Sequence, residues 1–132
     1  MNNKIFNKIL IQIERFLPML LVAVFIFIQS SKVRFTVSYI GWFDFLIHKL
    51  AHVVLFSLLF ITSCRAFKDK KIALIFTILY AISDEYHQSF VVTRTPAFSD
   101  VVIDSISASG IFYLSEKYQK KIPAVFRNFF NL

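Results

Sequence analysis

The chain has 132 residues and a formal net charge of +7, with 57% hydrophobic and only 17% charged residues. Soluble domains average about 45–50% apolar and about 25% charged residues, and one of this length could not bury so much apolar surface. The composition therefore argues against a soluble domain. With only 2 Gly and 3 Pro it also excludes collagen-like repeats, flexible linkers and disorder, and it indicates one membrane domain over residues 1–132.

The first predicted element is a membrane-spanning helix over residues 13–31. No charged residue occurs from Phe16 to Ser31, a stretch of about 24 Å as a helix. Apolar residues before it extend the span toward the roughly 30 Å of a hydrocarbon core. A cleaved signal peptide is the alternative, but Gln29-Ser30-Ser31 does not resemble a cleavage site and further apolar segments follow, so an uncleaved span is preferred.

The residues before this span form an amphipathic pattern. Ile5 and Ile9 share a helical face opposite Lys4 and Lys8. A helix of this kind lies in the membrane interface with its apolar face toward the acyl chains. We therefore expect the N-terminal stretch to lie at the membrane surface before the chain turns inward near Pro18.

Three later spans are predicted over residues 44–65, 71–92 and 97–116. The charge-free runs within them are too short to cross a bilayer alone, so polar residues must lie inside the membrane or at its edge. The run that begins at Ile72 has no polar face, which is typical of a helix embedded in lipid. The expected fold class is all-α, an integral membrane four-helix bundle.

The distribution of cationic residues predicts the orientation of these spans. With four spans, both termini and the middle loop share one side of the membrane, and that side holds most of the 15 Lys and Arg residues. The other side has only Lys32, Arg34, Lys49 and Arg94. The positive-inside rule then places both termini in the cytoplasm. We expect a multi-pass protein of the cytoplasmic membrane.

Ionisable residues concentrate near the outer ends of three predicted spans. Residues of this kind at membrane depth usually face a bundle interior or a wet cavity and mark function. The second span carries a stripe with a four-residue repeat, the third a run of consecutive polar residues, and the fourth another stripe. They are, in chain order, Asp44, His48, Lys49 and His52; Asp84, Glu85, His87 and Gln88; and Asp100, Asp104 and Ser107. We expect the three groups to meet in one pocket toward the outer leaflet.

The charges of this pocket do not balance. Four carboxyl groups, two on the third span and two on the fourth, face only Lys49 and Arg94. Three kinds of compensation stay open: a divalent cation, protonation of His52 or His87, or a carboxyl group kept neutral. Paired carboxyl groups suit general acid and base chemistry, and the planar fork of Arg94 suits phosphate or carboxylate.

The same residues resemble those of the VanZ-like family of small bacterial membrane proteins. The resemblance covers roughly residues 17–115 and rests on Lys49-x-x-His52, Asp84-Glu85-x-His87-Gln88-x-Phe90, Arg94, and Asp100-x-x-x-Asp104. It implies a compact all-α membrane protein and, for the founding member of the family, a link to low-level resistance to teicoplanin. The sequence departs from the usual family pattern at Val92-Thr93, where Pro-Gly is common.

The residues and the resemblance together predict a function. We expect a protein that binds, and in the fuller hypothesis modifies, an anionic head group of a lipid, a polyprenyl phosphate or another cell-envelope precursor. The catalytic candidates are Asp84, Glu85, His87 and Asp100, and the binding candidates are Lys49, His52, Gln88, Arg94 and Asp104. A metal requirement and the oligomeric state stay open.

Two other functions stay open beside this one. A non-enzymatic protein could mask envelope precursors from antibiotics, and a small dimeric transporter could have this length. The transporter is disfavoured because small four-helix exporters carry a Glu in the first span, which is absent from Phe16 to Ser31. Glycine-rich nucleotide motifs are excluded. Nucleic acid is not an expected partner, because the basic residues flank the spans.

Overall fold

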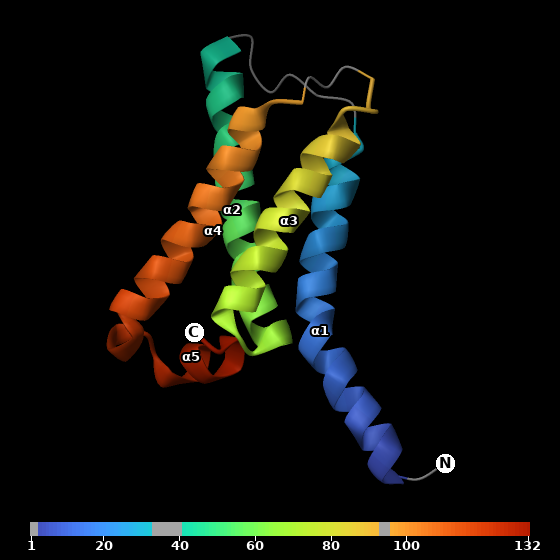
Figure 1. Ribbon diagram of the computed structural model, residues 1–132, viewed down its shortest axis with the longest axis vertical. Coiled ribbons are helices and arrows are strands. Elements are labelled where there is room, and N and C mark those ends of the chain that lie inside the picture. Colours follow the sequence, from blue (N-terminus) through green and yellow to red (C-terminus); the bar gives the residue numbers. More distant parts are fainter. Residues whose placement is uncertain (1–2, 33–40, 93–95) are drawn as a thin grey trace.

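The computed structural model describes residues 3–32, 41–92 and 96–132, except for the side chain of Asp44. In these ranges every regular element is a helix, which confirms the all-α expectation. Four long helices are followed by two short ones near the C-terminus (Figure 1). They are α1 (Asn3–Ser30), α2 (Gly41–Phe67), α3 (Lys70–Gln88), α4 (Phe98–Lys117), the 3₁₀ helix η1 (Gln119–Lys121) and α5 (Ala124–Phe130).

Each expected span overlaps one of the long helices, and α1 and α2 are long and apolar enough to cross a membrane. The third helix is shorter than its expected span, which ran to residue 92, because α3 ends at Gln88. After it the chain tightens into turns, with the backbone N–H groups of Phe90 and Val91 donating to the carbonyls three residues earlier. The short helix α5 had not been expected.

Pro18 lies inside α1, and the helix continues through it without interruption. A proline has no N–H group, so the carbonyl of Glu14 loses its partner four residues on. Arg65 of α2 supplies a replacement, since its Nη2 donates to that carbonyl at 3.4 Å. The expected inward turn at Pro18 is therefore not a break in the helix. The carbonyl that the proline leaves free instead receives a contact from the end of α2.

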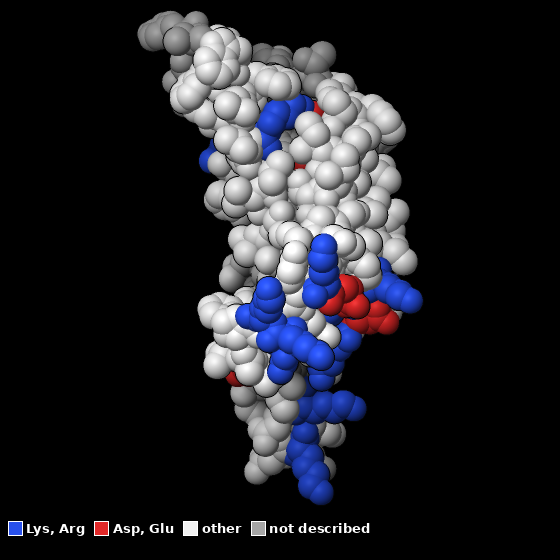
Figure 2. Space-filling view, turned by 90° about the vertical axis from the view of Figure 1, so that its left-hand side faces the viewer, with Lys and Arg blue, Asp and Glu red and all other residues white. Residues whose placement is uncertain are grey.

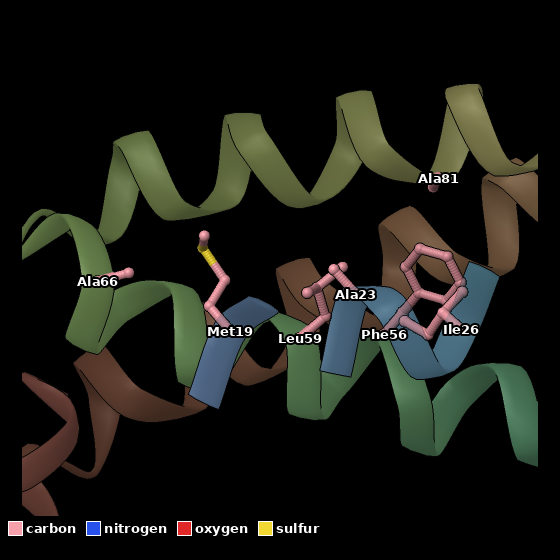
Figure 3. Packing of buried hydrophobic residues seen from close by; sticks show 7 residues of the cluster. All are labelled: Met19, Ala23, Ile26, Phe56, Leu59, Ala66 and Ala81. Carbon is pink, nitrogen blue, oxygen red and sulfur yellow. The ribbon is translucent and has the colours of Figure 1, made fainter. Parts of the chain in front are cut away.

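The helices pack around α2, which contacts α1, α3 and α4, while α3 also contacts α4. Figure 3 shows one apolar cluster, in which Met19, Ala23 and Ile26 of α1 meet Phe56 and Leu59 of α2. Small residues at the contacts, among them Ala66 and Ala81, let the helix backbones approach closely. The outward faces are mostly large apolar side chains, as α1 illustrates with Leu21, 61% exposed.

The two ends of the molecule differ in charge. On the face shown in Figure 2, Lys and Arg side chains gather over the end where α5 and the N-terminus lie. Nearer the other end, the same face shows only a small basic patch with acidic atoms beside it. At the basic end Asp69 begins α3, because its carboxylate accepts hydrogen bonds from the N–H groups of Lys71 and Ile72.

Candidate functional site

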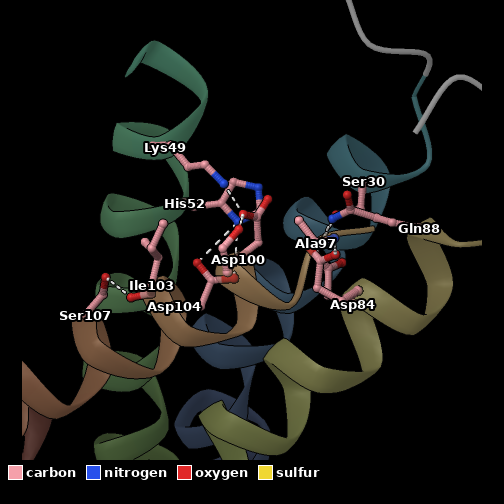
Figure 4. Close-up of polar contacts among 12 residues, drawn as sticks. Ser30, Lys49, His52, Asp84, Gln88, Ala97, Asp100, Ile103, Asp104 and Ser107 are labelled. Atoms are coloured by element: carbon pink, nitrogen blue, oxygen red, sulfur yellow. Dashed lines mark hydrogen bonds and ion pairs between the residues drawn. The ribbon is translucent and has the colours of Figure 1, made fainter. Parts of the chain in front are cut away.

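Two polar pairs join α2 to α4 (Figure 4), near the starts of both helices, which lie at the end of the molecule away from α5 (Figure 1). Lys49 Nζ donates to Asp100 Oδ1. One helical turn further, His52 Nδ1 lies 3.1 and 3.2 Å from the two carboxyl oxygens of Asp104. The spacing of three residues on α2 and four on α4 places both pairs on facing sides of the two helices. Asp104 is only 1% exposed, so its carboxyl group depends on His52 for a partner.

A second polar group joins α1 to α3. Asp84 Oδ2 accepts hydrogen bonds from Ser30 Oγ and from Gln88 Nε2, both at 2.9 Å. Asp84 and Gln88 are four residues apart and therefore share one face of α3. All three side chains are buried. The hydroxyl of Ser30 thus connects the end of α1 to the acidic segment of α3.

His87 contacts the end of α1 from the same part of α3. Its Nε2 lies 2.9 Å from Ser31 Oγ, and its ring lies 4.5 Å from that of Phe27, measured between centroids. Ser31 Oγ also donates to the carbonyl of Phe27 at 2.7 Å, within its own helix end. His87 and Asp100, both catalytic candidates from the sequence, have separate partners in this arrangement.

Glu85 ties the two groups together. Its Oε2 accepts a hydrogen bond of 3.0 Å from the backbone N–H of Ala97, the residue before α4 begins. Glu85 also interacts electrostatically with Asp84, His52 and Asp100. The polar segments of α2, α3 and α4 therefore form one electrostatic cluster at this end of the molecule.

Two carboxyl oxygens in the cluster stand out. Asp84 Oδ1 and Glu85 Oε1 are buried and have no hydrogen-bond partner among the described residues. The two residues are only 4% and 7% exposed. A buried acceptor without a partner costs about 1–3 kcal/mol, and more when it is charged. Two such atoms on adjacent residues indicate where a proton or a bound donor group would be stabilised.

The described residues hold no group of three or more His, Cys, Asp or Glu side chains arranged to bind a metal ion. Within the cluster, Asp84 and Glu85 carry the buried oxygen atoms without a partner, and two carboxyl groups alone rarely hold a divalent cation without further ligands. Each of these oxygen atoms is suited to accepting a hydrogen bond from a ligand.

Most of the residues singled out in the sequence lie in this cluster, and a few do not. Arg94 falls outside the described residues, as does the side chain of Asp44. His48 is half-buried on α2. Ser107 extends the α4 stripe, but its hydroxyl donates to the carbonyl of Ile103 in its own helix at 2.7 Å.

Sequence reasoning missed three contributors to the cluster: Ser30, Ser31 and the backbone N–H of Ala97. The two serines end an otherwise apolar span, and adjacent hydroxyls at such a place are a usable signal. The contribution of Ala97 has no side-chain signal, because any residue other than proline provides the same donor.

Comparisons with known proteins identify a family. A model of the VanZ/LLP1 family matches residues 7–115, which include all four long helices in whole or in most of their length. Neither the curated proteins nor the solved structures gave a match. Because the family match extends over most of the sequence and contains the whole polar cluster, the chain belongs to the VanZ/LLP1 family.

Proposed function

We propose that the protein is a four-span membrane protein with both termini in the cytoplasm. Three observations support this topology. The chain belongs to the VanZ/LLP1 family, α1 and α2 are apolar and long enough to cross a bilayer, and large apolar side chains cover the outside of the helices. The basic residues lie at the end that the positive-inside rule assigns to the cytoplasm. The polar cluster then faces the outer leaflet.

Its function, in this proposal, is to bind an anionic head group of a lipid or cell-envelope precursor at that cluster. The observation that carries the proposal is the pair of buried carboxyl oxygens without partners, Asp84 Oδ1 and Glu85 Oε1. These acceptors call for hydrogen-bond donors, which the hydroxyl or amino groups of a head group supply. The charge of a phosphate in the same head group is balanced by Arg94, which we assign from the sequence alone, beside the existing ion pair of Lys49 with Asp100.

Modification of the bound head group is the fuller form of the proposal. Asp84 and Glu85 are neighbouring carboxyl groups with free oxygen atoms, and paired carboxyl groups suit general acid and base chemistry on a bound ligand. His52 and Asp104 hold the α2 side of the cluster in place, and Gln88 holds Asp84. The structure holds the carboxyl groups firmly, which is what proton transfer at a fixed position requires.

A binding measurement tests the first form. We expect the purified protein in detergent to bind dioctanoyl phosphatidylglycerol, which has hydroxyl donors, at least about tenfold more tightly than dioctanoyl phosphatidylcholine, which has none. Glu85→Gln should reduce this preference, because an amide provides a weaker acceptor than a carboxylate. Glu116→Gln is the matched control, since that carboxyl group is exposed at the other end of α4. Equal binding of both lipids would refute the assignment.

A susceptibility measurement tests the link to antibiotics. Wild type and Glu85→Gln, matched for abundance in the membrane, are expressed in a teicoplanin-susceptible Gram-positive host and compared against teicoplanin and vancomycin. Protection against teicoplanin that disappears with Glu85→Gln supports a function that depends on the cluster. If both proteins protect equally, or if neither protects, resistance does not depend on head-group binding at the cluster.

Masking of precursors by a non-enzymatic protein is the second candidate. The observation in its favour is that each of the four carboxyl groups already has a partner from another residue, as in a network that only holds helices together. In that case protection survives Glu85→Gln, provided that the variant folds and reaches the membrane.

A further inference from the structure

A second polar site lies at the opposite end of the molecule from the acidic cluster. A surface pocket of about 330 Å³ is formed there by α1, the end of α2 and the segment around α5. Its lining includes three cationic side chains and one carboxyl group: Arg15, Arg65 and Lys68, with Glu14. The pocket therefore has an excess of two positive charges. Along α2, its Arg65 lies more than three helical turns from His52 of the polar cluster.

The two arginines present unused donors. Arg15 Nε and Arg65 Nε are buried and have no hydrogen-bond partner among the described residues. A guanidinium group offers five N–H donors in a planar fork that fits phosphate oxygens, and it keeps its charge at any ordinary pH. Two buried donors from neighbouring cations, with a single carboxyl group beside them, indicate an anionic ligand.

The structure holds Arg65 in place for such a ligand. One face of its guanidinium group stacks on Phe129 of α5, with Cζ 3.6 Å from the ring centroid. Its Nη2 donates to the carbonyl of Glu14, which Pro18 leaves without a helical partner. These two contacts fix the plane of the group beside the pocket, while its Nε keeps no partner among the described residues. Much of the conformational entropy that a free arginine loses on binding is therefore already lost.

Lys68 adds a cation at the rim. It follows α2 with φ of 60°, in the left-handed region that favours glycine. This is the conformation in which helices commonly end, and the N–H of Lys68 donates to the carbonyl of Cys64 at 2.9 Å. The apolar part of the lining, Ile11 and Phe129, is half or more exposed and continues the apolar surface of α1.

We infer that this pocket binds the phosphate monoester head group of a lipid in the leaflet at the basic end of the protein. A phosphate monoester has a charge of about −1.5 to −2 at neutral pH, which matches the excess charge of the pocket, whereas a diester has only one negative charge. Basic pockets between membrane helices are suited to lipid head groups. The exposed side chains of Ile11 and Phe129 provide the contact for an acyl chain. This inference is independent of the function proposed for the outer cluster.

Binding to the full-length protein in detergent tests it, with dioctanoyl phosphatidic acid as the lipid probe and dioctanoyl phosphatidylcholine and inorganic phosphate as comparisons. We expect phosphatidic acid to bind at least about tenfold more tightly than either of them. The double substitution Arg15→Gln and Arg65→Gln should weaken its binding by at least about tenfold, since each charge-assisted hydrogen bond contributes more than a neutral one.

A control with the same loss of charge separates the pocket from a general electrostatic effect. The double substitution Lys71→Gln and Lys120→Gln removes two exposed cations at the same end that do not line the pocket. Binding of phosphatidic acid should then change by less than about threefold. Arg65→Lys keeps the charge but not the fork, so an intermediate loss is expected. If the double arginine variant does not fold, the single substitution Arg15→Gln is used for the test. The guanidinium group of Arg15 lies over the ring of the neighbouring Phe16.

Three results would overturn the inference. Phosphatidic acid could bind no better than phosphatidylcholine, or the arginine variants could bind it as wild type does, and either result removes the site. Inorganic phosphate that binds as tightly as phosphatidic acid, with the same dependence on the arginines, would assign the pocket to a soluble phosphate and refute the lipid. A failure of the function proposed for the outer cluster would be seen with phosphatidylglycerol and Glu85→Gln, so the two outcomes are distinguishable.

Discussion

The contact between His52 and Asp104 gives the sharpest test of how the polar cluster stabilises the fold. Asp104 is 1% exposed, and both of its carboxyl oxygens lie within 3.2 Å of the same ring nitrogen. His52→Leu leaves a buried carboxyl group without its partner, a change that typically costs about 3–5 kcal/mol. Asp104→Ala leaves a histidine that is 18% exposed and can turn to solvent, so we expect a smaller loss of about 1–2 kcal/mol.

The double variant decides whether this reasoning holds. With both partners replaced, no buried charge remains, and the loss should be about 2 kcal/mol smaller than the sum of the two single losses. The free energies are measured by unfolding in mixed micelles with increasing SDS, followed by far-ultraviolet circular dichroism. Asp104→Asn is the control that keeps the shape and one acceptor. Losses that add to within about 0.5 kcal/mol would refute a coupled pair.

Three further substitutions test single contacts by the same unfolding measurement. Tyr80→Phe removes a hydroxyl that donates to a backbone carbonyl of α1 at 2.6 Å, and we expect a loss of about 1 kcal/mol; no loss would mean that packing alone holds α1 against α3. Asp69→Ala removes the N-cap of α3 and should also cost about 1 kcal/mol, while the helix content of the folded protein stays nearly unchanged. Ser30→Ala removes a buried donor to Asp84 and should cost about 1–3 kcal/mol, more than Ser31→Ala at an exposed contact; equal losses would contradict the burial argument.

The two ends of the molecule differ in the sign of their excess charge and in the kind of buried atom left without a partner. At the polar cluster the carboxyl groups outnumber the cations among the described residues, and the free atoms are acceptors. At the basic pocket the cations outnumber the single carboxyl group, and the free atoms are donors. The two sites therefore offer opposite kinds of free atoms to a ligand, and each proposal is tested with its own substitutions, Glu85→Gln for the cluster and the arginine variants for the pocket.

The sequence by itself determined the class of the protein. The apolar composition and the positions of charged residues are enough to indicate helices in a membrane, because the cost of placing charges in hydrocarbon restricts where they can occur. It also singled out the polar residues of the cluster, since ionisable side chains such as Asp104 inside apolar segments require an explanation. The helical boundaries followed to within a few residues except at the start of α1, which lies ten residues before the expected span, at the end of α3, and in the unexpected α5.

Only the tertiary structure decided which of these residues meet. Helical periodicity places Lys49 and His52 on one face of α2, but it does not say which helix that face contacts. The pairing with Asp100 and Asp104 depends on how α2 and α4 pack, a contact between residues about fifty positions apart. The basic pocket likewise needed α5 beside the ends of α1 and α2. The local sequence determines helical periodicity and polarity. Long-range packing determines which side chains contact each other, and both sites consist of side chains from different helices.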